Sequence, residues 1–130
     1  MMIQEENLLK YLEMLMDSRI RQTGKVVNPP IKLLKSIANT ISDVRRELCS
    51  LKLQPELTRY CKDLKRVETR AKELIDEFNG TIENLDLGNI TAEEAPGIIA
   101  SKISTFLDER STENVLFRLK NIKESMRNMR

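Results

Sequence analysis

The chain has 130 residues, of which 32% are charged, 4% are aromatic and none is histidine. This composition, with only four glycines and four prolines, is typical of a helical bundle and argues against a sheet protein. The 22 basic and 20 acidic residues give a net charge of +2, which argues against a nucleic-acid binder that works by massed phosphate neutralisation. A chain of this length can enclose one compact core.

The sequence indicates an intracellular, cytoplasmic protein. No stretch approaches the roughly 20 apolar residues of a membrane span. The first residues, MMIQEENLLKYLEMLMDSR, lack the basic and uninterrupted apolar regions of a secretory signal. In the cytoplasm Cys49 and Cys61 are expected to be free thiols. A hairpin folded about Gln54-Pro55 would nevertheless bring the two cysteines to the same end.

The first expected helix covers residues 3–22. Glu5 and Glu6 lie in its first turn, where the helix dipole favours negative charge. Gly24 and the Pro29-Pro30 pair should end it, because glycine accepts a left-handed cap and proline cannot continue a helix. Its apolar stripe consists of Leu8, Leu12, Leu15 and Ile20.

Two long helices are expected at residues 31–53 and 55–86. Apolar residues recur every three or four positions in both, which predicts a narrow apolar stripe on each. The short connection between them indicates an antiparallel hairpin. Asn79-Gly80 is the weak point of the second, because an interior glycine costs roughly 1 kcal/mol against alanine. A kink or fray is expected there, and a full break stays open. Examples of the stripe positions are Leu34, Ile37, Ile41, Val44, Leu64, Val67, Leu74 and Phe78.

Two further helices are expected at residues 92–109 and 112–129. Thr91 and Glu94 have the spacing of a capping box. Pro96-Gly97 follows closely, so the helix begins either at Thr91 with a distortion or only at Ala95. Ser111 or Thr112 is expected to cap the last helix, whose apolar stripe includes Val115, Leu119, Ile122, Met126 and Met129.

The sequence therefore predicts an all-α fold, an elongated antiparallel helical bundle of about five helices with coiled-coil-like heptad packing. Residues 1–130 form one domain in this interpretation, built on the central hairpin. Ile41 and Leu64 on the hairpin seam should be buried. Five apolar stripes exceed what one small bundle is expected to cover, which predicts self-association through a terminal helix.

Catalytic constellations are missing from the sequence. Without histidine there is no histidine triad, imidazole base or histidine metal site. The two cysteines lack the spacing of a zinc or redox motif, and the scattered glycines form no phosphate-binding loop. We expect no enzyme activity, no cofactor and no metal.

The last helix is the one segment with a charge bias. Arg118, Lys123 and Arg127, together with Lys120 and Arg130, are opposed only by Glu124. A basic amphipathic helix can bind an acidic partner, a membrane surface or nucleic acid. The alternative interpretation is favourable placement of cations near a helix C-terminus.

The middle of the chain contains four charged helical segments, SIANTISDVRRELCSL, YCKDLKRVETRAKELIDEF, IENLD and KISTFLDER. Together they resemble the BAG domain of chaperone cofactors, a bundle of three long, charged helices. The resemblance covers about residues 35–113. It implies binding to the nucleotide-binding domain of a heat-shock ATPase chaperone, with Asp76 and Asp86 as the acidic contacts and Lys102 as the nearest basic one. Pro96-Gly97 stands about where the family has its basic pair.

The function expected from these observations is a non-catalytic helical adaptor or scaffold. Its partner would be another protein that is helical or has a helix-binding groove. Two alternatives stay open. One is a BAG-like co-chaperone, and the other is a binder of nucleic acid or another acidic surface through the basic last helix.

Overall fold

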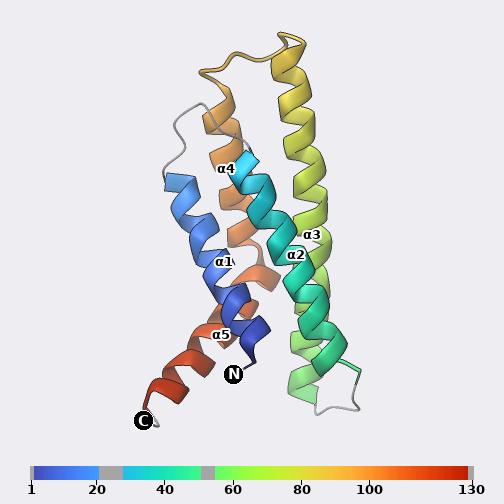
Figure 1. Ribbon diagram of the computed structural model, residues 1–130, viewed down its shortest axis with the longest axis vertical. Helices are drawn as coiled ribbons and strands as arrows, with labels where there is room; N and C mark the ends of the chain where they lie inside the picture. The colour runs from blue at the N-terminus through green and yellow to red at the C-terminus, as the bar shows by residue number, and fades with distance from the viewer. Residues whose placement is uncertain (1, 21–27, 51–54, 129–130) are drawn as a thin grey trace.

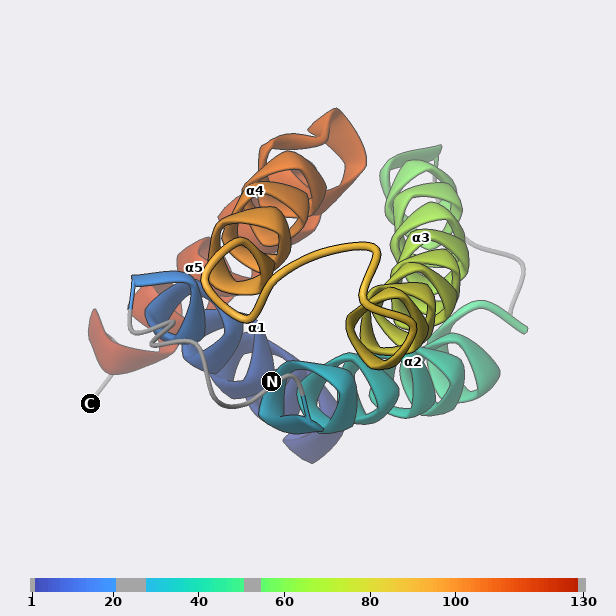
Figure 2. The same cartoon turned by 90° about the horizontal axis from the view of Figure 1, so that it is seen from above.

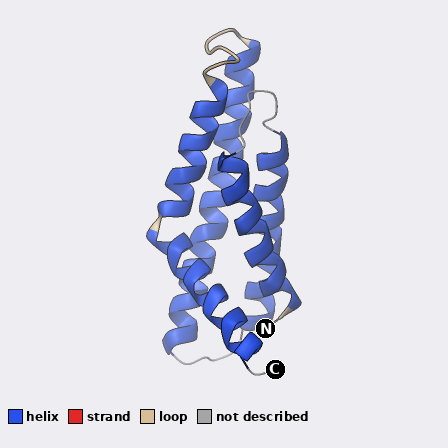
Figure 3. Ribbon diagram, turned by 90° about the vertical axis from the view of Figure 1, so that its left-hand side faces the viewer, coloured by secondary structure: helices blue, strands red, loops and turns tan. Residues whose placement is uncertain are grey.

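A computed structural model describes residues 2–20, 28–50 and 55–128, and every regular element in these ranges is a helix (Figures 1 and 3). The all-α bundle expected from the sequence is confirmed. The expected Gly24 cap and the expected ends of the first and last helices, at residues 22 and 129, lie outside the described residues. The helices are α1 Ile3–Ile20, α2 Asn28–Leu48, α3 Pro55–Asp86, α4 Ala95–Asp108 and α5 Arg110–Asn128.

Helix α3 has the bounds that the sequence predicts, but it continues unbroken through Asn79-Gly80. The expected fray is therefore wrong, and the break that stayed open does not occur. Phe78 and Thr81, on either side of the pair, are both buried. Tertiary packing of these two side chains outweighs the roughly 1 kcal/mol that an interior glycine costs.

Helix α2 begins three residues earlier than expected and ends at Leu48 rather than at residue 53. A turn at Cys49 and Ser50 follows it. The Ser50 hydroxyl donates a 3.1 Å hydrogen bond to the carbonyl of Arg46. That bond satisfies one of the carbonyls that a helix end leaves without a partner.

The fourth helix starts at the second of the two positions that the sequence left open, whereas the start of the fifth differs from expectation. α4 begins at Ala95, after a turn in which Thr91 Oγ1 accepts a 3.2 Å hydrogen bond from the Glu94 amide. α5 begins at Arg110, so Ser111 and Thr112 lie inside its first turn and are buried. The expectation that one of them caps this helix is wrong.

The helices form a ring seen from above (Figure 2). α2 lies between α1 and α3, and α4 and α5 close the other side by packing against both. α4 and α5, with 14 and 19 residues, together match the 32 residues of α3 in length. The two helices follow one another end to end and bend at Glu109, whose backbone is extended. Arg70 Nε of α3 donates a 2.7 Å hydrogen bond to Glu109 and thereby fixes the bend against α3.

One core runs through the ring. Ile41 and Leu64 are fully buried in it, which confirms the predicted seam. Leu8, Leu12 and Leu15 of the α1 stripe are also fully buried, so these residues do not supply the uncovered stripe that the self-association prediction requires. Self-association stays a prediction. The largest fully buried side chains are Phe78, Phe106, Leu8, Leu12, Leu15, Leu34, Ile37, Ile41, Leu64, Leu74, Ile99 and Ile103.

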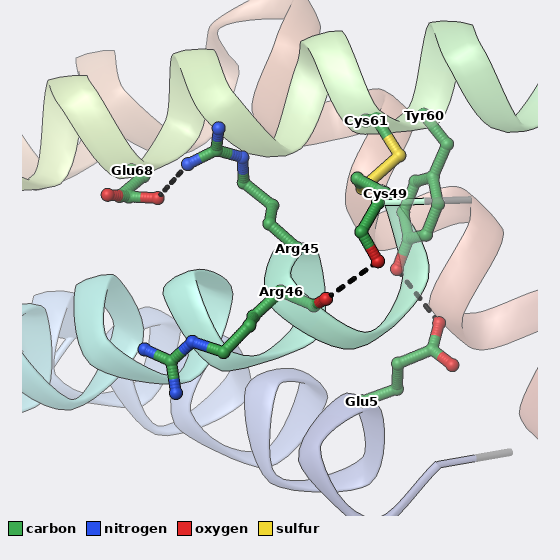
Figure 4. Close-up of a disulfide and its surroundings, with 8 residues drawn as sticks. Glu5, Arg45, Arg46, Cys49, Tyr60, Cys61 and Glu68 are labelled. Carbon is green, nitrogen blue, oxygen red and sulfur yellow. Dashed lines mark hydrogen bonds and ion pairs between the residues drawn. A yellow bond between two sulfur atoms is a disulfide. The ribbon is translucent and has the colours of Figure 1, made fainter. Parts of the chain in front are cut away.

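Cys49 and Cys61 form a disulfide at the end of the α2–α3 hairpin (Figure 4), with an S–S distance of 2.09 Å and a Cα–Cα distance of 5.9 Å. The expected free thiols are therefore wrong, whereas the expected meeting of the two residues is confirmed. The antiparallel hairpin supplies the reason. It brings the end of α2 beside the second turn of α3, within the separation that a disulfide requires.

Candidate functional site

A cleft of about 610 Å³ lies between the first half of α3 and the first half of α5. We call it the α3–α5 cleft. Four arginines and two carboxylates line it, and all six come from these two helices. They are Arg59, Arg66, Arg110, Arg118, Glu56 and Asp63.

Helical periodicity places the arginines on the cleft. Arg59 and Arg66 are seven residues apart on α3, which puts them two turns apart on one face. Arg110 and Arg118 are eight residues apart on α5, again near two turns. Packing of α5 against α3 then turns both pairs toward one space.

Tyr60 links the cleft to the rest of the bundle. The Arg118 guanidinium lies 4.5 Å from the centroid of the Tyr60 ring, a cation–π contact between α5 and α3. The Tyr60 hydroxyl donates a 2.9 Å hydrogen bond to Glu5 of α1 (Figure 4). Burial, followed by the Glu5 charge and this hydrogen bond, raises the pKa of Tyr60 well above its ordinary value. Tyr60 is therefore a neutral donor at neutral pH.

The cationic groups of the cleft are poorly neutralised. Arg59, Arg66 and Arg110 are exposed, and none of the three forms an ion pair with a described residue. Arg118 Nε is buried and has no hydrogen-bond partner in this part of the chain. By contrast, Arg45 forms an ion pair with Glu68 at 2.9 Å. The arrangement can accept carboxylate or phosphate oxygens without breaking an existing ion pair.

A second hollow with apolar residues at its edges continues from the cleft along α5. Phe117, with 68% of its surface exposed, borders both the cleft and this hollow. Ile122 and Met126 follow it, and the three residues border the hollow, which has a volume of about 420 Å³. We call Phe117, Ile122 and Met126 the α5 strip. Val115 and Leu119 lie on the side of the helix opposite Phe117 and are fully buried, so Phe117 is additional to the surface that the bundle uses. Ile122 and Met126 border the hollow from the other side, the side of Val115 and Leu119.

The structure separates the basic residues that the sequence groups on the last helix. Arg118 lies in the α3–α5 cleft. Lys123 borders a different hollow, shared with Glu6 and Glu13 of α1. Arg127 is exposed near the end of α5.

The residues suggested by the BAG resemblance lie at the other end of the molecule. Asp76 and Asp86 are exposed on α3. Lys102 of α4 reaches α3, where its Nζ lies 3.8 Å from Glu77. Lys102 is therefore beside the acidic face of α3, but its nearest carboxylate is Glu77.

Three members of the cleft, Arg59, Arg66 and Arg110, are missing from the residues that sequence reasoning selected. The seven-residue spacing of the first two is visible in the sequence. In the sequence this spacing does not identify a binding site, however, because exposed charges on any solvated helix have similar spacings. Only the packing of α5 beside α3 distinguishes this pair from other surface charges.

Among the described residues, no group of three or more acidic or cysteine side chains could hold a metal ion. No helix in these ranges is long and apolar enough to cross a bilayer. Comparison of the chain with protein-family models, curated proteins and solved structures gives no significant match. The BAG resemblance therefore stays a prediction.

Proposed function

We propose that this chain is a non-catalytic helical interaction module that docks a helix of another protein on the α5 strip. The observation that carries the proposal is the exposure of Phe117 on a helix whose opposite face is already buried in the core. Exposed aromatic and aliphatic anchors beside a polar rim are typical of binding surfaces.

The shape of the surface supports a helical partner. The hollow bordered by Phe117 on one side and by Ile122 and Met126 on the other extends along more than two turns of α5 and lies next to the cleft. A partner helix carrying apolar residues at intervals of three and four positions can pack into such a hollow and contact the apolar residues on both of its sides. Burial of the anchors then supplies the favourable free energy of binding.

The test uses one matched pair of variants. Phe117→Asp places a charge in the strip, whereas Leu87→Asp changes a residue of similar exposure, 66%, in the turn that follows the far end of α3. Displayed helical peptides are selected for binding to the unmodified chain. The site where they bind is then mapped from changes in the amide chemical shifts of the chain. We expect the peptides to shift resonances of the strip, to lose binding to Phe117→Asp and to keep it with Leu87→Asp. Equal binding to both variants, or selection of no peptide, contradicts the proposal.

A BAG-like co-chaperone is the second candidate, favoured by the position of Lys102 beside the acidic face of α3. In that case the chain accelerates nucleotide release from a heat-shock ATPase domain, and reversal of both Asp86 and Lys102 abolishes the effect without changing the melting temperature. A fluorescence titration of labelled nucleotide measures it. No acceleration at tens of micromolar removes this candidate.

A further inference from the structure

The α3–α5 cleft and the α5 strip form one continuous surface. Phe117 and Arg118 border both the cleft and the hollow beside the strip. A helix that covers the strip therefore has one flank next to the arginines. Its polar face contributes to binding as well as its apolar face.

The charges of the cleft indicate which charge the partner helix should carry on the flank next to the arginines. Arg59, Arg66 and Arg110 are exposed and form no ion pair with any described residue. Arg118 is held in place against Tyr60. Arginine presents a planar set of donors that matches a carboxylate, and a positioned arginine loses little freedom when it binds one.

We infer that the α3–α5 cleft binds the acidic face of an amphipathic partner helix whose apolar face covers the α5 strip. This inference rests on the proposed function and adds the chemistry of the partner to it. Arg59 and Arg66 are separated by about 10 Å along α3, at 1.5 Å per residue. Acidic residues seven positions apart on the partner helix have the same separation and meet both arginines.

The two carboxylates of the cleft favour a protein partner over nucleic acid. Glu56 lies one turn before Arg59, and Asp63 lies between Arg59 and Arg66. Asp63 is also held by a 3.4 Å hydrogen bond from Asn114. A phosphate backbone is negative along its whole length and would be repelled at these points. A helix with acidic residues at intervals can avoid them.

The test uses three fluorescein-labelled peptides that share one apolar face and carry Glu, Gln or Lys at the polar positions. Binding to the unmodified chain is followed by anisotropy at low and high salt. We expect the Glu peptide to bind at least tenfold more tightly than the Gln peptide, and the difference to shrink as salt screens the charges.

Charge-reversed variants locate the effect. Arg59→Glu/Arg66→Glu should abolish the preference for the Glu peptide and favour the Lys peptide. Lys35→Glu/Lys65→Glu changes the net charge equally at exposed positions away from the cleft and should keep the preference. Circular dichroism of both variants checks that each is folded. Equal loss of preference in the two variants would assign the effect to net charge and overturn the inference.

Other outcomes separate this inference from the proposed function. If the Glu and Gln peptides bind equally and Phe117→Asp abolishes both, the docking surface stands and its acidic partner is wrong. If no peptide binds, both proposals fail. An oligonucleotide that displaces the Glu peptide and binds more tightly would overturn the inference in favour of nucleic acid. A dimer that Phe117→Asp dissociates would show that a second copy covers the strip, which also overturns it.

Discussion

The guanidinium of Arg118 on α5 lies over the ring of Tyr60 on α3, 4.5 Å from its centroid. The hydroxyl of the same tyrosine donates a hydrogen bond to the buried carboxyl group of Glu5 on α1. One side chain thus connects three helices and also forms part of the α3–α5 cleft. The bundle and its candidate binding surface depend on the same contact.

Replacing Tyr60 by Phe should lower the free energy of unfolding by about 1–3 kcal/mol, because it leaves the buried Glu5 carboxyl group without its donor. Urea denaturation followed by circular dichroism measures the change. Tyr11→Phe is the matched control. Tyr11 is half-buried on α1, and its hydroxyl has no hydrogen bond to the described residues. Loss of this hydroxyl should change the free energy of unfolding by no more than about 0.5 kcal/mol. Equal effects of the two changes would rule out this role for the Tyr60 hydroxyl.

The largely buried Glu68 should make stability depend on pH in the acid range. Burial disfavours its charged form, but hydrogen bonds from Arg45 at 2.9 Å and Lys72 at 3.1 Å outweigh burial and hold the pKa of Glu68 below its ordinary value. Because the folded pKa is the lower one, the stabilisation is complete above the unfolded pKa of about 4.3. It is lost as pH falls through the folded pKa.

Glu68→Gln should therefore flatten the fall in stability below about pH 5, where the unfolded chain begins to take up protons. Urea midpoints measured at a series of acid pH values show the slope. Glu83→Gln changes an exposed carboxyl group of the same helix and should leave the slope nearly unchanged. A slope in Glu68→Gln identical to that of the unmodified chain would contradict the assignment.

Two glycines should respond to alanine in opposite directions. Gly80 lies inside α3, and a Cβ added there meets no atom within 4 Å, so Gly80→Ala should stabilise the chain by about 0.4–1 kcal/mol. Gly88 follows α3 with a φ of +76°, so Gly88→Ala should destabilise it by about 1–2 kcal/mol. Thermal melts of both variants suffice. Destabilisation by Gly80→Ala would mean that the glycine is needed in α3.

Removal of the Cys49–Cys61 disulfide should lower the free energy of unfolding by about 2–3 kcal/mol, because the bond closes a short loop and restricts the unfolded chain. The two residues are 12 positions apart. Urea unfolding with and without a reductant measures the loss. Cys49→Ser/Cys61→Ser should show the same lowered stability and no response to the reductant. An unmodified chain that ignores the reductant would contradict the prediction.

The same bond bears on the expected cytoplasmic location. Disulfides persist in oxidising compartments, and the cytosol keeps most thiols reduced. Alkylation of the protein in intact cells, followed by mass measurement, reports whether the two cysteines are paired. Paired cysteines in the cell would contradict a permanently reducing location.

The sequence by itself determined the helical class, the bounds of α3 and the buried seam at Ile41 and Leu64. Each of these is local information. An apolar residue every three or four positions defines one face of a helix whatever that face later contacts. The antiparallel hairpin follows from the short connection between α2 and α3, and it was enough to bring Cys49 and Cys61 to the same end.

Tertiary structure decided the rest. Gly80 stays helical because packing of its neighbours outweighs a local preference of roughly 1 kcal/mol. Phe117 is exposed although its residue type is typical of a core, because α5 buries its other face. Arg59 and Arg110, 51 residues apart in the chain, share a cleft only because α5 packs beside α3. Helix-surface charges have much the same pattern everywhere in a sequence, so their function depends on which faces the folded bundle leaves uncovered.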